Sequence, residues 1–256
     1  MSKFFIKQAF AEAIDLQKNG KYKEAKELYS KILKNNPDDA NAQHLISLIF
    51  MAEGNFNDAK KYLELAIKSE PNQAVFLSNY GALLHSMGDN ESAIVAYEKA
   101  IHLDQKHFQS YYSLGIIYSD LKDYDRAVEN YQRALEIDNS SAPAHNNLAN
   151  VFSNTNNPEA EYHYKKLIEL VPNQVYPRLN MANFLIKQSR FNDAMSALDE
   201  LVSMDIATKE VFNSLGVCYK GIEDNENAIK MFRQALSIDG NFPLAIENLK
   251  SLGEEA

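Results

Sequence analysis

Alanine recurs at a nearly constant spacing along most of this 256-residue chain. A bulky side chain follows each of these alanines after four residues, and a further apolar side chain follows after seven. Offsets of four and seven place all three residues on one face of a helix. A fixed period of this length is typical of repeat architectures. The alanines are 34 residues apart, with one interval of 33: Ala25, Ala59, Ala93, Ala127, Ala160, Ala194 and Ala228.

A second amphipathic stretch precedes each alanine-bearing helix, as in Tyr111, Leu114 and Tyr118. Turn residues such as "NGK" at 19–21 and "GDN" at 88–90 separate the two stretches. The repeating unit is therefore predicted to be helix, tight turn, helix. We expect the recurrent alanine on the second helix to contact a recurrent small residue on the first. These small residues are Ala13, Ser47, Gly81, Gly115, Ala149, Ala182 and Gly216.

The unit is most complete in "YYSLGIIYSDLKDYDRAVENYQRALEID" (111–138) and "FNSLGVCYKGIEDNENAIKMFRQALSID" (212–239). It resembles the tetratricopeptide repeat family, and the resemblance covers almost the whole chain. It implies an all-α fold, an α-solenoid forming a right-handed superhelix of seven helix-turn-helix units with a C-terminal capping helix. The expected boundaries are a lead-in at 1–5, repeats at 6–39, 40–73, 74–107, 108–141, 142–174, 175–208 and 209–242, and a capping helix or truncated eighth motif at 243–256.

Charge and hydropathy exclude several partner classes. The net charge of −9 and the lack of a run rich in lysine and arginine argue against a nucleic-acid partner. The longest apolar stretch, "LISLIFMA" at 45–52, is far shorter than the ~18–20 residues that a membrane span needs. The single cysteine, Cys218, rules out an intrachain disulfide and fits a reducing compartment. We therefore expect a soluble, cytoplasmic protein without membrane insertion.

No catalytic pattern is present in the sequence. The glycines fall in turns or at helix contacts and form no phosphate-binding loop. The six histidines have no metal-ligand spacing with Cys218. His145 falls at a helix–helix seam, and Cys218 falls at a core position of a first helix. The sequence thus predicts a protein that is not an enzyme and needs no cofactor or metal.

The asparagines are distributed unevenly. Of 26, nine lie away from turns and helix ends, and eight of these nine occupy the fifth, sixth or ninth position of a first helix. The resemblance implies that these positions line the inside of the superhelix. General richness in asparagine is the alternative explanation. The candidate groove residues are Asn79, Asn146, Asn147, Asn150, Asn180, Asn183, Asn213 and Asn248, together with Tyr112 and Tyr176, which serve either as groove contacts or as packing between first helices.

A carboxamide offers one acceptor and two donor hydrogens, which is the pairing that a peptide backbone presents. A row of amides could therefore hold an extended peptide segment without recognising its side chains. The pattern "NNLAN" at 146–150 resembles the tetratricopeptide superhelix of O-linked N-acetylglucosamine transferases, although Ser113 and Ser214 interrupt the row. We predict a non-enzymatic protein-interaction module or scaffold that holds an extended segment of a protein partner in its concave groove, centred on repeats three to seven.

Chaperone tails that end in carboxylates are not the expected ligand. Family members that bind such tails use lysine and arginine at positions that hold Asn146, Glu210 and Ser214 here. Two alternative functions remain open. In one, the chain is the substrate-recruiting arm of a larger transferase whose catalytic domain lies elsewhere. In the other, it is an architectural scaffold that assembles with itself.

The first two repeats carry apolar residues where later repeats carry amides. This candidate association patch comprises Phe10, Ile14, Leu45 and Leu48. Contiguous apolar surface of this kind favours a partner or a second copy of the chain, that is, a homo-oligomer. The alternative is that the ends of the coil fold over the patch and bury it.

Overall fold

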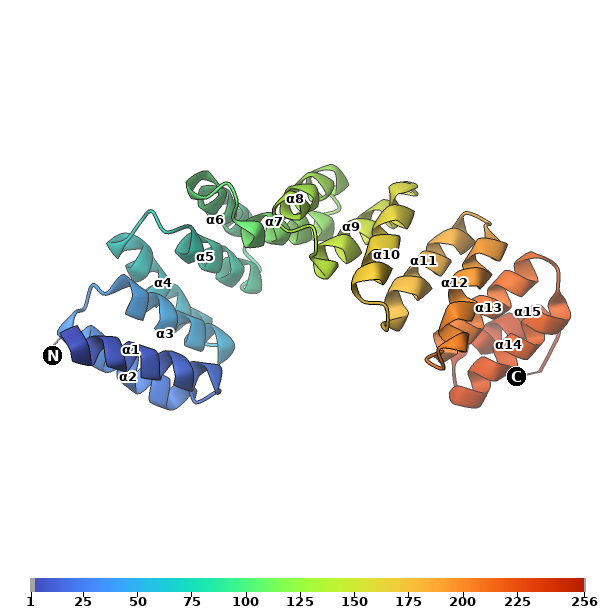
Figure 1. The fold of residues 1–256 in the computed structure, drawn as a ribbon, viewed down its shortest axis with the longest axis horizontal. Coiled ribbons are helices and arrows are strands. Elements are labelled where there is room, and N and C mark those ends of the chain that lie inside the picture. Colours follow the sequence, from blue (N-terminus) through green and yellow to red (C-terminus); the bar gives the residue numbers. More distant parts are fainter. Residues whose placement is uncertain (1–2, 256) are drawn as a thin grey trace. The chain divides into compact units, whose positions relative to one another are not determined.

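The computed structural model describes residues 3–255, which form fifteen helices and no strand (Figure 1). The chain divides into two compact units, residues 1–138 and 139–256. The helices of the first are α1 (Lys3–Lys18), α2 (Tyr22–Asn35), α3 (Ala40–Ala52), α4 (Phe56–Ser69), α5 (Ala74–Ser86), α6 (Asn90–Leu103), α7 (Phe108–Asp120) and α8 (Tyr124–Ile137). Those of the second are α9 (Ala142–Asn154), α10 (Glu159–Leu170), α11 (Val175–Lys187), α12 (Phe191–Ser203), α13 (Lys209–Gly221), α14 (Asn225–Ile238) and α15 (Pro243–Ser251).

Within each unit, every odd-numbered helix packs against the even-numbered helix that follows it, and the pairs stack in chain order. We call the odd-numbered members first helices and the even-numbered members second helices. The short α15 follows the last pair and packs on α14 and α13. The all-α solenoid predicted from the sequence is confirmed. Helix α1 begins at Lys3, before the expected start of the first repeat at residue 6, and residues 1–2 of the expected lead-in lie outside the described residues.

The two helices of a pair meet through a small residue and a ring. A Cβ placed on Gly115 would lie 2.5 Å from the ring of Tyr131, and one on Gly81 would lie 3.0 Å from the ring of Tyr97. The nearest side chain to these glycines is therefore the aromatic residue four positions after the recurrent alanine, a contact that the sequence analysis did not predict. The tyrosine ring reaches across the seam and fills the space that glycine leaves. The alanines are completely buried beside it.

The turns between paired helices have one backbone shape but two kinds of residue. Gly20, Gly54 and Gly88 adopt positive φ angles of 73°, 73° and 84°. The corresponding position in later repeats is occupied by Lys122, Asn156, Ser189 and Glu223, with φ between 54° and 64°. A residue with a Cβ is disfavoured in this left-handed region, whereas glycine is not. The later turns therefore keep the shape at a conformational cost.

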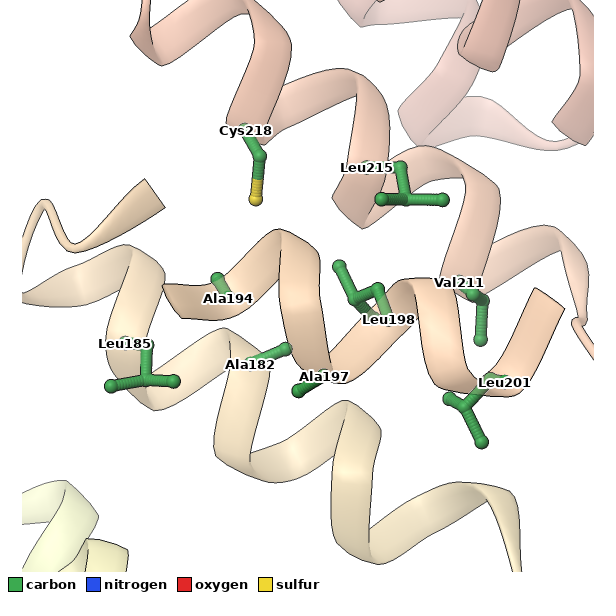
Figure 2. Close-up of a cluster of buried hydrophobic side chains, with 9 residues drawn as sticks. All are labelled: Ala182, Leu185, Ala194, Ala197, Leu198, Leu201, Val211, Leu215 and Cys218. Atoms are coloured by element: carbon green, nitrogen blue, oxygen red, sulfur yellow. The ribbon is translucent and has the colours of Figure 1, made fainter. Parts of the chain in front are cut away.

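Three helices of the C-terminal unit share one buried cluster, shown in Figure 2. Leu185 comes from α11, Leu198 from α12, and Leu215 and Cys218 from α13. Burial raises the pKa of the Cys218 thiol to about 12, so the side chain behaves as a small apolar group. The cluster holds α11 and α13 against α12 and so fixes the spacing of two neighbouring first helices.

Candidate functional site

First helices of neighbouring pairs approach one another, whereas second helices spread apart. In the N-terminal unit α5 contacts α7, and in the C-terminal unit α11 contacts α13 and α13 contacts α15. Grooves open between second helices instead, one of about 670 Å³ between α4 and α6 and one of about 540 Å³ between α10 and α12. Each unit therefore has a closed side formed by first helices. We call this surface the first-helix face; the candidate asparagines all lie on the helices that form it.

In the C-terminal unit, asparagines of this face bond to neighbouring first helices. The Asn248 amide of α15 donates to Oδ1 of Asn213 on α13 over 3.0 Å. The Ser214 hydroxyl of α13 donates to Oδ1 of Asn183 on α11 over 3.1 Å. Asn213 is only 8% exposed, so its bond is shielded from water. These contacts connect three successive first helices and fix their register.

The N-terminal unit contains an equivalent bond. Nδ2 of Asn79 on α5 lies 2.7 Å from Nε2 of His44 on α3. The His44 ring is buried against Phe76, with ring centroids 4.6 Å apart, and burial lowers the pKa of His44 to about 4. Because the imidazole is neutral at pH 7, its Nε2 accepts the hydrogen bond from the amide. The pair is separated by 35 residues, as are Asn213 and Asn248.

The three asparagines of α9 are arranged differently. The Tyr164 hydroxyl donates to Oδ1 of Asn150 over 2.9 Å. The amide of Asn146 donates to Oδ1 of its neighbour Asn147 over 3.3 Å. The Asn146 oxygen is buried and accepts no hydrogen bond from any described residue. A buried acceptor of this kind costs about 1–3 kcal/mol, so α9 carries a local excess of hydrogen-bonding capacity.

The remaining candidates lie on α11 and α7. The Asn180 side chain is half-buried and makes no hydrogen bond to the part of the chain that is described. Tyr176 is 41% exposed one helical turn before it. On α7, Tyr112 stacks on Phe108 with ring centroids 5.8 Å apart and tilts against Tyr131 at 6.0 Å. Tyr112 therefore packs within its own helix pair, and Tyr176 and Asn180 remain accessible.

The apolar residues of the association patch are half-buried rather than exposed. Phe10 and Leu45 pack against the core cluster of α1, α2 and α3, and the Phe10 ring lies 6.2 Å from that of Tyr29. Ile14 and Leu48 are half-buried as well. Much of the patch is thus engaged in the core of its own unit.

A buried histidine pair in the C-terminal unit was not anticipated. Nδ1 of His145 on α9 lies 2.9 Å from Nδ1 of His163 on α10, and Nε2 of His145 lies 3.2 Å from the Asn139 carbonyl oxygen. Burial lowers the pKa of both rings, that of His163 to about 4. Among the described residues, no three histidine, cysteine or acidic side chains gather as metal ligands would. The pair joins two helices of one repeat.

One further group was missed. Position two of the first helices carries exposed apolar side chains where position six carries asparagine, as for Val75 with Asn79 and Leu244 with Asn248. The pattern is visible in the sequence once the repeats are aligned.

None of the described helices has the length and apolar character needed to cross a membrane.

Family models of the tetratricopeptide repeat match residues 16–78, 108–141 and 210–242, and a model of the TPR repeat matches residues 81–122. Together these matches cover more than half of the chain. The chain belongs to the tetratricopeptide repeat family. Proteins of this family are generally scaffolds for protein interactions. The comparison with curated proteins yields no match.

Solved tetratricopeptide repeat structures resemble the chain along most of its length. The C-terminal part of a repeat protein from Cytophaga hutchinsonii is 18% identical, with a TM-score of 0.79 over 94% of this chain and 99% of that one. A protein from Parabacteroides merdae is 19% identical, with a TM-score of 0.63 over 96% and 97%. YrrB, described as a TPR protein with an unusual peptide-binding site, is 25% identical, with a TM-score of 0.65 over 73% and 97%.

Proposed function

We propose that this tetratricopeptide repeat protein acts without catalysis of its own and binds an extended peptide segment of a partner on the first-helix face of its C-terminal unit. The observation that carries the proposal is the unused hydrogen-bonding capacity of neighbouring helices. Asn180 on α11 makes no side-chain hydrogen bond to the described residues, and the Asn146 oxygen on α9 has no donor there. A peptide backbone supplies both donors and acceptors.

The amides that bond to one another can still contribute. Each carboxamide has two donor hydrogens and an oxygen with two lone pairs, and the bond between Asn213 and Asn248 uses only one donor and one lone pair. Each bond to a partner would add about 0.5–1.5 kcal/mol net. The amides therefore provide orientation and modest affinity, and additional affinity must come from side-chain contacts.

Two observations support this proposal. The similar structure of YrrB carries a peptide-binding site according to its description, which fits a peptide ligand for this chain as well. Within this chain, Phe10 and Leu45 pack against their own core, which favours the amide-bearing face over the apolar patch.

The test is to replace Asn146 and Asn180 together by alanine and to measure capture of partner peptides from a digest of the native cell. We expect unchanged helicity and a strong reduction in capture. Asn192→Ala serves as the matched control, because Asn192 is exposed on the second helix α12. Capture that is equal in the double variant and in the control would refute the proposal.

A further inference from the structure

Apolar side chains and amides are paired along the first helices of the C-terminal unit. Tyr176 precedes Asn180 by one turn on α11, and Leu244 precedes Asn248 by one turn on α15. Residues four apart share one face of a helix. Tyr176 is 41% exposed and Leu244 is 54% exposed, so both apolar groups are available beside their amides.

The helix between them breaks the pattern in both positions at once. On α13, position two is Glu210 and position six is Ser214. The hydrogen bond from Ser214 to Asn183 and the bond from Asn248 to Asn213 fix the register of α11, α13 and α15. Tyr176, Glu210 and Leu244 are 34 residues apart and hold position two in three successive repeats. Tyr176, Glu210 and Leu244 therefore form a row across three neighbouring helices.

Glu210 is the charged member of this row. Its carboxylate accepts a hydrogen bond from the Thr208 hydroxyl over 2.6 Å and forms no ion pair with any described residue. The adjacent cation is engaged elsewhere, since Lys209 pairs with Asp239 at 2.6 Å. An acidic group between two exposed apolar groups is complementary to a basic group between two apolar ones.

We propose, building on the function proposed above, that the bound segment is extended, with an apolar side chain against Tyr176, a basic side chain against Glu210 and a second apolar side chain against Leu244. Packed helices lie about 8–10 Å apart. A polyproline II chain rises about 3.1 Å per residue with three residues per turn, so residues three apart point to the same side. The three contacts are then made by residues about three positions apart, and the net charge of −9 favours a basic partner.

The experiment is a selection of random twelve-residue peptides, displayed on phage, against the full chain, with the Asn146→Ala/Asn180→Ala variant as the background. The expected result is enrichment of peptides with apolar residues about six positions apart, lysine or arginine midway, and few acidic residues. No enrichment over the variant would overturn the proposed function and this inference together. Enrichment of peptides without the pattern would overturn the inference alone and leave the proposed function standing.

Variants of the row then test each contact with one synthetic peptide from the selection. Glu210→Lys should weaken its binding by about tenfold and should favour a peptide in which the basic residue is replaced by glutamate. Tyr176→Ser and Leu244→Ser should each weaken binding several-fold. Val202→Ser is the matched control, because Val202 is 40% exposed on the second helix α12. Unaltered charge preference in Glu210→Lys, with helicity retained, would refute the assignment.

Discussion

The first two repeats carry apolar side chains at the positions where the last repeat and the capping helix carry amides. Phe10 on α1 and Leu45 on α3 are 35 residues apart, and both pack on an apolar core. Asn213 on α13 and Asn248 on α15 are also 35 residues apart and share a hydrogen bond. Apolar packing tolerates small displacements, whereas a hydrogen bond requires a set distance and angle. The amides therefore define the register of the C-terminal helices and leave further polar groups on the surface.

Introducing an amide among the apolar side chains of the first two repeats should have the largest effect on stability. Leu45→Asn removes apolar packing and places an amide against the apolar cluster of α1, α2 and α3. We expect a loss of about 2–4 kcal/mol in the free energy of unfolding, measured by urea denaturation. Leu45→Met, which conserves volume, is the control and should cost less than half as much. Equal losses for the two variants would show that the polarity of the side chain at position 45 does not affect stability.

The second largest effect should be a difference between the two units in how much stability each loses at acidic pH. The pKa of His44 is about 4 when folded and about 6.5 when unfolded, so the unfolded chain binds a proton first as pH falls. Above pH 6.5, His44 is neutral in both states and does not lower the free energy of unfolding. Between pH 6.5 and pH 4, the free energy of unfolding falls by roughly 1 kcal/mol per pH unit. The C-terminal unit holds two such rings, His145 and His163, and should be the more acid-sensitive unit.

Hydrogen exchange at pH 7 and at pH 5 measures this difference unit by unit. The amide protons of the C-terminal unit should lose more protection on acidification than those of the N-terminal unit, after correction for the intrinsic exchange rate. His163→Phe should reduce the difference, since phenylalanine takes up no proton. A larger loss of protection in the N-terminal unit would contradict the assignment.

Breaking the bond between the last two first helices should cost less. Asn248→Leu leaves the buried Asn213 oxygen without its donor, and we expect about 1–2 kcal/mol of destabilisation in urea. The double variant Asn213→Leu/Asn248→Leu recreates the chemistry of Phe10 and Leu45 and should recover most of the loss. Additive effects of the two substitutions would show that the pair is not coupled.

The smallest effect concerns the turns. The N-terminal repeats place Gly20, Gly54 and Gly88 at positive φ, whereas later ones place residues such as Ser189 there. Ser189→Gly should relieve strain and stabilise the chain by about 0.5–1 kcal/mol, seen as a higher melting temperature. Gly88→Ala should do the reverse by a similar amount. A destabilised Ser189→Gly variant would mean that chain entropy outweighs the strain.

The sequence alone was sufficient to predict the helix pairs, because the 34-residue period and the buried alanines both follow from local spacing. It also placed the asparagines on first helices. It did not predict their partners, because the bond between His44 and Asn79 depends on the distance between two helices that are far apart in the chain. The same reason applies to His163, whose contact with His145 requires the packed pair. The contact between Gly115 and Tyr131 depends on the reach of a ring, which residue spacing does not encode.

That contact has a consequence for how such chains diversify. Gly115 and Tyr131 lie on either side of a turn, and a larger residue at position 115 would collide with the Tyr131 ring unless that ring also changed or moved. The heritable module is thus the hairpin as a whole, from the start of a first helix to the end of its second. Shuffled versions of this protein should tolerate crossovers placed after a second helix and should fail when the crossover falls inside a hairpin.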